Sequence, residues 1–203
     1  MKLYHFPSPN PQKVTFALRE LGLECEVVPV DLAKGEQRKP EFLAINPFGR
    51  VPVLIDGDLT LWDSQVILNY LGEKTGKLWP TSTAGRVDAL RWLFFLSGHL
   101  TPPAGEVANR IRSKVLGVPL DEAMVARGEK ALPGVLGVVE GQLAKGKWML
   151  GDDFTLVDCA YGPILNVIEK AGFSYSDFPN VRAYLDAIRS RSAWDQTPKV
   201  PGL

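Results

Sequence analysis

The sequence predicts an α/β domain followed by an all-helical domain. Strand and helix signals alternate over residues 1–76, whereas no convincing strand run follows residue 85. Between them, residues 77–85 are rich in Pro, Thr, Ser and Gly, a composition typical of a linker. We therefore expect a first domain over 1–76, a linker over 77–85 and a helical domain over 86–203.

The first half of the α/β domain reads as strand, helix, strand. Residues 2–5 favour a short strand, and Asn10-Pro11 then predicts a helix start with Asn as N-cap and Pro in the first turn. Residues 26–30 favour a second strand, whose internal Pro29 fits a sheet edge better than a central position.

The second half of this domain contains a hairpin between two helices. Residues 40–44 predict a short helix, and the β-rich runs 51–55 and 59–62 are joined through an Asp-Gly turn. A helix beginning near Ser64 follows, with apolar residues at helical spacing. The predicted order is therefore β-α-β-α-β-β-α.

The remaining chain contains only helical patterns. We expect helices over 86–100, 104–116, 120–144, 156–171 and 180–191. A break is predicted at Pro102-Pro103 between the first two, because proline disrupts a helix interior. The 120–144 segment also holds four glycines and Pro133. Gly and Pro cost about 1 and 3 kcal/mol each against Ala, so packing must override them.

Composition excludes several classes of function. Lys plus Arg and Asp plus Glu both number 23, and no long basic run occurs, which argues against a nucleic-acid partner. No segment approaches the roughly 18 apolar residues of a membrane span, and the N-terminus lacks a signal-peptide pattern. We expect a soluble cytoplasmic protein with no membrane partner. Cys25 and Cys159 form no C-x-x-C pair and are predicted to be buried; with His5 and His99 far from both, no metal site is expected.

Five segments, in the same order and at compatible spacing, resemble the serine-type cytosolic glutathione transferases, and the first domain looks most like the phi or theta enzymes of bacterial or plant style. The segments are residues 8–14, 35–41, 46–54, 61–67 and 151–158. The resemblance implies a thioredoxin-like first domain that binds glutathione, an all-α second domain and a homodimer. In such dimers the first domain of one subunit packs on the helical domain of the other.

Ser8 is the residue that the resemblance implies for the glutathione thiol. A hydroxyl just before a helix offers a donor together with the positive end of the helix dipole. Lowering a thiol pKa by ~2 units requires about 2.7 kcal/mol. A hydrogen bond to a charged acceptor supplies roughly 1.5–3 kcal/mol, so no general base is required. The alternatives are that Ser8 only caps the helix, or that the Asn10 amide is the thiol's partner.

Other positions are implied to bind the rest of glutathione. A cis Val51-Pro52 bond would present the Val51 backbone to the cysteinyl unit in the manner of an added strand. Asp63 and Ser64 would bind the γ-glutamyl group at a helix start. The candidates for the glycyl carboxylate are Gln37, Arg38, Lys39 and Arg50. Gln37 departs from the commoner pattern, which has histidine there.

The predicted reaction is conjugation of glutathione to small hydrophobic electrophiles, with peroxide reduction as a related activity and detoxification as the expected role. We expect the electrophile pocket to be lined from the 86–99 helix by Arg91, Trp92, Phe95 and His99, with Tyr161 or Trp194 as further candidates. Thr155-x-x-Asp158 reads as a capping box that serves folding. A glutathione-dependent disulfide or peroxide reductase and a non-catalytic binding module remain the alternatives.

Overall fold

The α/β domain forms the first part of the chain, as predicted. The computed structural model describes residues 1–196, and the last residues of the predicted second domain, 197–203, lie outside this range. The elements of the first domain are β1 (Lys2–His5), α1 (Pro9–Glu20), β2 (Glu26–Pro29), α2 (Pro40–Ile45), β3 (Val53–Asp56), β4 (Leu59–Trp62) and α3 (Ser64–Thr75).

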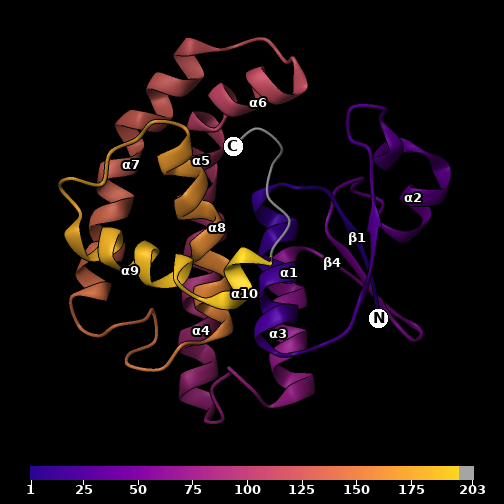
Figure 1. Cartoon of the computed structure of the whole chain (residues 1–203), viewed down its shortest axis with the longest axis horizontal. Helices are drawn as coiled ribbons and strands as arrows, with labels where there is room; N and C mark the ends of the chain where they lie inside the picture. Colours follow the sequence, from indigo (N-terminus) through magenta and orange to yellow (C-terminus); the bar gives the residue numbers. More distant parts are fainter. Residues whose placement is uncertain (197–203) are drawn as a thin grey trace.

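These strands build one four-stranded mixed sheet in the order β2-β1-β3-β4. β1 runs parallel to β2 and antiparallel to β3, with Leu3 opposite both Val27 and Leu54. β2 is an edge strand, which confirms the expectation from Pro29. Helices α1 and α3 lie between the sheet and the helical domain, whereas α2 lies on the outer side (Figure 1).

Two local features of the first domain differ from the prediction. Helix α1 begins at Pro9 with Ser8 as its N-cap residue, so the prediction that Asn10 is the N-cap was wrong. Asn10 instead occupies the first turn of the helix. A short 3₁₀ helix, η1 (Glu36–Arg38), precedes α2 and was not predicted.

The second domain is helical throughout residues 83–196 apart from its connecting loops. Its elements are α4 (Thr83–Phe95), the π-helical turn η2 (Leu96–Leu100), α5 (Thr101–Val107), α6 (Asn109–Leu116), α7 (Glu122–Leu143), α8 (Leu156–Lys170), α9 (Pro179–Arg189) and α10 (Ser192–Asp195). The predicted break at Pro102-Pro103 was wrong. Both prolines lie in the first turn of α5, after the π-helical turn, where the α-helical hydrogen-bond pattern is interrupted.

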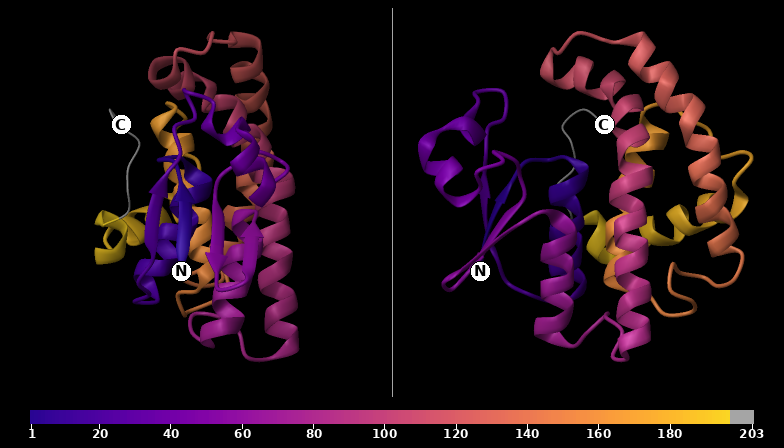
Figure 2. Two further views of the ribbon diagram at one scale, coloured as in Figure 1. Left: turned by 90° about the vertical axis from the view of Figure 1, so that its right-hand side faces the viewer. Right: turned by 180° about the vertical axis from the view of Figure 1, so that it is seen from behind.

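The two domains share a continuous hydrophobic core. Helix α1 packs against α8, and the Phe16 ring meets the rings of Phe154 and Trp194 edge-on at centroid distances of 5.9 and 5.4 Å. Arg191 donates two hydrogen bonds to the Glu20 carboxylate at 2.6 and 2.7 Å. The C-terminal half of α1 is therefore held against the helical domain. Figure 2 shows the two domains from two further sides.

A fully buried carboxylate anchors the start of α8. Asp158 accepts hydrogen bonds from the backbone N–H groups of Thr155 and Met149 at 2.7 and 2.9 Å, and from the Tyr184 hydroxyl at 2.8 Å. The capping box between Thr155 and Asp158 is confirmed. Burial nevertheless raises the pKa of Asp158, against the effect of these donors.

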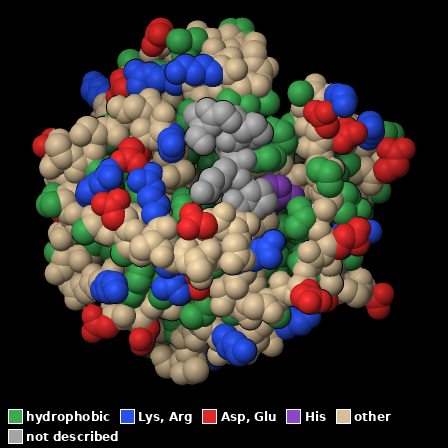
Figure 3. Space-filling model, in the orientation of Figure 1, with side chains coloured by type: hydrophobic (Ala, Val, Ile, Leu, Met, Phe, Trp, Pro, Cys, Tyr) green, Lys and Arg blue, Asp and Glu red, His purple; other side chains and the backbone are tan. Residues whose placement is uncertain are grey.

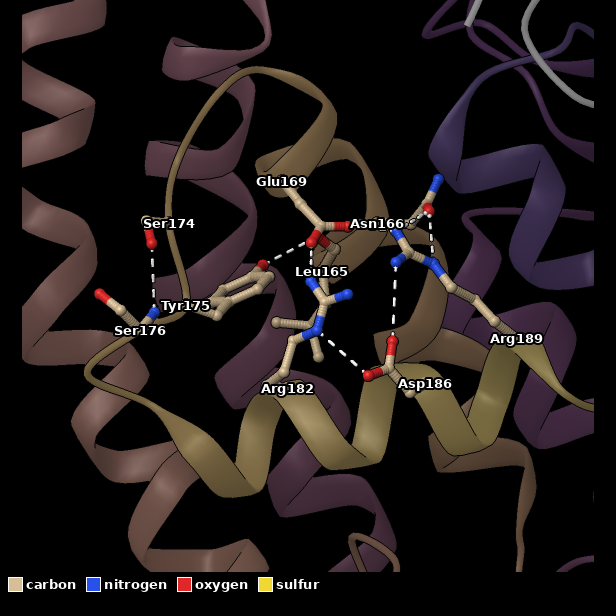
Figure 4. A network of polar contacts seen from close by, with 9 residues as sticks. All are labelled: Leu165, Asn166, Glu169, Ser174, Tyr175, Ser176, Arg182, Asp186 and Arg189. Carbon is tan, nitrogen blue, oxygen red and sulfur yellow. Dashed lines mark hydrogen bonds and ion pairs between the residues drawn. The ribbon is translucent and has the colours of Figure 1, made fainter.

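Polar side chains join α8 to α9 on another side of α8 (Figure 4). Arg189 donates to Asn166 and Glu169 at 2.6 and 2.5 Å, and Arg182 pairs with Glu169 and with Asp186. The fold thus explains this charge cluster as packing between two helices.

The surface carries charges of both signs. Lys and Arg side chains are interspersed with Asp and Glu over the face in Figure 3. Cys159 is buried as predicted, but Cys25 is only half-buried, because β2 lies at the sheet edge. Within residues 1–196, no helix combines the length and the apolar character that a membrane span requires.

Candidate active site

A cavity of about 620 Å³ lies between the two domains. One side is formed by the loop between β1 and α1, the segment around η1 and the loop before β3; the other side is formed by α5, α6 and α8. Six of the predicted site residues line this cavity: Ser8, Asn10, Gln37, Arg38, Arg50 and Val51.

Ser8 and Asn10 lie at the N-terminus of α1 and face this cavity. Ser8 has the extended backbone of an N-cap residue (φ −145°, ψ 162°), but its hydroxyl caps no backbone N–H. Pro9 at the first helical position fixes the backbone where the helix begins. The hydroxyl is therefore available to a ligand at the positive end of the α1 dipole.

The charged groups that line the cavity, among the residues described, are all arginines: Arg38, Arg50 and Arg112. No described carboxylate lines it. The Gln37 side-chain oxygen is buried without a hydrogen-bond partner. A ligand that carries carboxylates and peptide groups fits such a lining.

The loop before β3 is held in one conformation by side-chain hydrogen bonds. The Asn46 amide donates to the Arg50 carbonyl at 2.6 Å, and the Asn46 side-chain oxygen accepts from the Phe48 N–H at 3.0 Å. Gly49 has a φ of 63°, and a Cβ there would lie 2.9 Å from the Gln37 carbonyl oxygen. Asn46 was missed as a positioning residue, although its place two residues before an exposed loop residue is typical of an Asx turn.

The peptide bond between Val51 and Pro52 is cis, as the resemblance implied. Val51 lines the cavity, whereas Pro52 is buried behind it. The Val51 backbone lies just before β3, so its polar groups are next to the edge of the sheet where β3 begins and β1 ends.

Asp63 and Ser64 form the start of α3 and do not line the cavity themselves. Asp63 has a φ of 73°, a conformation that non-glycine residues rarely adopt, and its carboxylate accepts from the Gln65 N–H at 2.9 Å. Ser64 is buried and donates its hydroxyl hydrogen to the Gln65 side chain at 2.7 Å. The two residues thus form an ordered helix start, with Asp63 near α1.

Lys39 is not brought to the cavity. Its side chain is exposed and pairs with Glu36 at 3.3 Å, three residues earlier in the chain. This placement fits a solvated surface lysine rather than a ligand for the glycyl carboxylate.

Lys13 is a buried cation that sequence reasoning missed. Its side chain is fully buried in α1, and its Nζ atom has no hydrogen-bond partner. Burial lowers the pKa of Lys13 to about 7, and the negative charge of Asp63 partly opposes this shift. No local pattern distinguished it, because a lysine in an amphipathic helix is ordinarily read as solvent-facing.

The predicted pocket residues on α4 and η2 do not line the cavity; these are Arg91, Trp92, Phe95 and His99. Trp92 is buried in the core and accepts, through its carbonyl, a hydrogen bond from the Tyr161 hydroxyl at 2.9 Å. Trp194 packs on Phe16. The prediction that this segment lines the cavity was wrong, because the wall is supplied by residues 101–116 and by α8 instead.

Comparison with known proteins identifies the class to which this fold and site belong. Residues 1–73 match the family model of the glutathione S-transferase N-terminal domain, and residues 88–192 match that of the C-terminal domain. The chain is 36% identical to glutathione S-transferase 3 of Zea mays, over 97% of this chain and 92% of that protein. It is 31% identical to the disulfide-bond oxidoreductase YfcG of Escherichia coli, over 96% of this chain and 92% of that protein.

Solved structures agree with this. A glutathione transferase of Burkholderia graminis, determined with two glutathione molecules per subunit, superposes with a TM-score of 0.88 at 32% identity, covering 99% of this chain and 88% of that one. Glutathione transferase F2 of Populus trichocarpa gives a TM-score of 0.88 at 27% identity, covering 97% of this chain and 96% of that one. The chain belongs to the glutathione S-transferase family.

Proposed function

We propose that this protein binds glutathione, stabilises its thiolate and conjugates it to small hydrophobic electrophiles. The observation that carries the proposal is the Ser8 hydroxyl, which faces the cavity at the N-terminus of α1 without capping the helix. The lining beside it carries arginines and no described carboxylate. A peptide with two carboxylates and a thiolate is complementary to that charge.

The thiolate is stabilised by hydrogen bonding and by the helix dipole. A free thiol with a pKa of about 8.5 is only about 3% ionised at pH 7. A hydrogen bond from Ser8 to the charged sulfur contributes roughly 1.5–3 kcal/mol, and the end of α1 adds about 0.3–1 kcal/mol. Together these lower the thiol pKa by about 2 units, since each unit corresponds to about 1.4 kcal/mol.

The remaining groups of glutathione have partners around the sulfur. Gln37, Arg38 and Arg50 bind the glycyl end, with Lys39 too far out to contribute directly. The Val51 backbone pairs with the cysteinyl unit in extended geometry. Asp63 and Ser64 receive the γ-glutamyl group at the start of α3, where helix N–H groups favour a carboxylate.

In the reaction the thiolate attacks the electrophilic carbon. A C–S bond forms, the bond from that carbon to the leaving group breaks with its electron pair, and the thiol proton has already passed to solvent. The protein contributes by holding the two reactants together and by stabilising the anion.

The test is the ultraviolet absorbance of the bound glutathione thiolate, measured against pH for the wild type and for Ser8→Ala. We expect a thiol pKa well below the free value that rises by 1–2 units in Ser8→Ala. Asn10→Ala, measured in parallel, tests the competing donor on the same helix turn. A lowered pKa that is unchanged in Ser8→Ala would move the role to Asn10 or to the helix terminus. Failure to bind glutathione at millimolar concentration would favour a non-catalytic binding module.

A second candidate is a glutathione-dependent disulfide reductase. Asn10 lines the same cavity, and one relative is a disulfide-bond oxidoreductase. In that reaction the thiolate would attack one sulfur of a disulfide and release the other as thiolate. Disulfide reduction that survives Ser8→Ala and is lost in Asn10→Ala would support this candidate over the first.

A homodimer is the assembly that we propose. Large apolar side chains are exposed on α3 and α4, both of which pack against α8: Val66 is 49% exposed, Val87 62% and Phe94 71%. Trp62, just before α3, is 44% exposed. Large exposed apolar side chains are often covered by a partner subunit. Sedimentation that gives only the 22.3 kDa chain mass would contradict the dimer. The cytoplasmic location and the role in detoxification stay predictions.

A further inference from the structure

The helical wall of the cavity is almost entirely apolar. Its residues come from α5, α6 and α8, and all but two are apolar or glycine: Pro102, Ala104, Gly105, Ala108, Ile111, Val115, Leu116, Ile164 and Val167. The exceptions are Thr101 and Arg112. The Thr101 hydroxyl oxygen is buried and has no hydrogen-bond partner. One cation therefore stands in a wall that otherwise suits a hydrophobic substrate.

Arg112 differs from the arginines around it. Arg110, on the same helix, pairs with Glu129 at 2.6 Å and donates to the Ala171 carbonyl at 3.2 Å, and Arg127 pairs with Glu106 at 2.7 Å. The Arg112 guanidinium forms no ion pair and no hydrogen bond with another residue of the described chain, although the residue is half-buried. Burial holds the pKa of the Arg112 guanidinium below its usual value.

A guanidinium that has lost part of its water and gained no partner is costly to hold. A ligand carboxylate can remove this cost, because the planar guanidinium accommodates two parallel hydrogen bonds to carboxylate oxygens. No described carboxylate lines the cavity, so the described residues offer the Arg112 guanidinium no counterion there. Arg38 and Arg50, on the opposite side, are already assigned to the glycyl end of glutathione.

We propose that Arg112 binds the carboxylate of the second substrate, and that this substrate is an apolar electrophile with a single acidic group. The inference rests on the proposed transferase function. The apolar body lies along α5 and α6 with its reactive carbon toward the thiolate at Ser8. A second glutathione, with two carboxylates and an ammonium group, fits a wall with one cation and nine apolar or glycine residues less well.

The experiment compares two aryl chlorides that differ in charge, 4-chloro-3,5-dinitrobenzoate and the corresponding benzamide. In both, the glutathione thiolate forms a C–S bond at the ring carbon and chloride leaves. Each enzymatic kcat/KM is divided by the uncatalysed rate with glutathione, which removes the difference in intrinsic reactivity. We expect the acid-to-amide ratio to fall about 10–100-fold in Arg112→Gln, mostly through KM, and to recover partly in Arg112→Lys. Lys114→Gln, an exposed charge on the same helix, is the matched control and should leave the ratio unchanged.

Several results would overturn the assignment. Equal losses for acid and amide would make Arg112 a residue of packing rather than of recognition. A changed pKa of the bound glutathione thiol in Arg112→Gln would place Arg112 in the glutathione site. Loss of glutathione-dependent disulfide reduction without loss of acid preference would identify a second glutathione as its ligand.

If the proposed transferase function is wrong, the role of Arg112 can still be tested by binding alone. If the wild type binds glutathione but converts neither chloride, calorimetry with the unreactive 2-naphthoate and 2-naphthamide still tests Arg112. Preferential binding of the acid that disappears in Arg112→Gln supports the inference. Equal binding of the two compounds refutes it.

Discussion

Replacing Lys13 by Met should remove a large pH dependence from the stability of this protein. Lys13 is fully buried in α1, its Nζ atom lacks a hydrogen-bond partner, and burial lowers its pKa to about 7 while Asp63 opposes the shift. In the unfolded chain a lysine has a pKa of about 10.4. Between these two values the unfolded state binds one more proton than the folded state, so stability must rise with pH.

The expected size follows from the two pKa values. Below pH 7 the lysine is protonated in both states and its contribution is constant; above pH 7 the folded state gains about 1.4 kcal/mol per pH unit until the unfolded lysine also loses its proton. From pH 7 to pH 9, Lys13 should therefore raise the free energy of unfolding by about 2 kcal/mol. Met has a similar unbranched shape and cannot titrate, so it keeps the packing and removes the proton.

The measurement is urea unfolding of the wild type and Lys13→Met at pH 7, 8 and 9, with the difference between the two proteins taken at each pH. Taking the difference also removes the contribution of the two thiols, because both proteins contain them. Burial raises the pKa of Cys25 and Cys159, so their titration would otherwise lower the stability as pH rises. Lys130→Met, at an exposed position of α7, should follow the wild type. If the difference in the free energy of unfolding between wild type and Lys13→Met stays constant from pH 7 to pH 9, the argument that burial lowers the pKa of Lys13 is refuted.

Two further substitutions test the packing. Asp158→Ala should lower the free energy of unfolding by about 3 kcal/mol or more, because four buried donors lose their acceptor, and Asp158→Asn should cost less; urea unfolding that ranks the two equally would contradict this. Gly72→Ala should lower the thermal midpoint, because its Cβ would lie 2.5 Å from the Trp79 ring, at a cost of about 1–3 kcal/mol. Gly137→Ala, exposed in α7 with open space around it, should raise the thermal midpoint, because it adds up to about 1 kcal/mol to the stability of the helix. A midpoint that moves in the same direction in both variants would count against this reasoning.

Most of the fold could be predicted because its signals are local. Pro29 indicated an edge strand, the Asp-Gly turn indicated a hairpin, and Ser64 indicated the start of α3. In each case the residue that carries the signal also determines the backbone at that position. The helical patterns of the second domain matched α7, α8 and α9 for the same reason, despite Pro133 inside α7.

The errors arose where two local solutions compete. Ser8-Pro9 and Asn10-Pro11 both have the form of a cap residue followed by proline, so the sequence alone does not decide where α1 begins. At Pro102-Pro103 the local rule predicts a break, but the prolines follow a π-helical turn that already interrupts the α-helical ladder. Tertiary packing selects between such solutions, and a local sequence pattern carries no information about that packing.

The site divides in the same way. Ser8, Gln37 and Val51 lie on segments that follow or precede strands of one small sheet and line one cavity. They were predicted as site residues because of the family resemblance of their segments, not from the order of the elements. The wall opposite was assigned to α4, whereas it comes from α5, α6 and α8. Which face of a helix borders a cavity depends on how it crosses its neighbours, and those crossings involve side chains far apart in sequence.

The helical wall of the cavity and the start of α1 can be altered separately by substitution. The core that joins Phe16 to Trp194, together with the Arg191–Glu20 pair, holds the C-terminal half of α1 against the helical domain, and these four residues do not line the cavity. Substitutions along α6 can therefore alter the shape and charge offered to the second substrate without moving Ser8. Variants of the wall should change KM for the electrophile, and variants of Ser8 should change the pKa of the thiol. In double variants the two changes in log(kcat/KM) should add, because Ser8 and the α6 residues lie on opposite sides of the cavity.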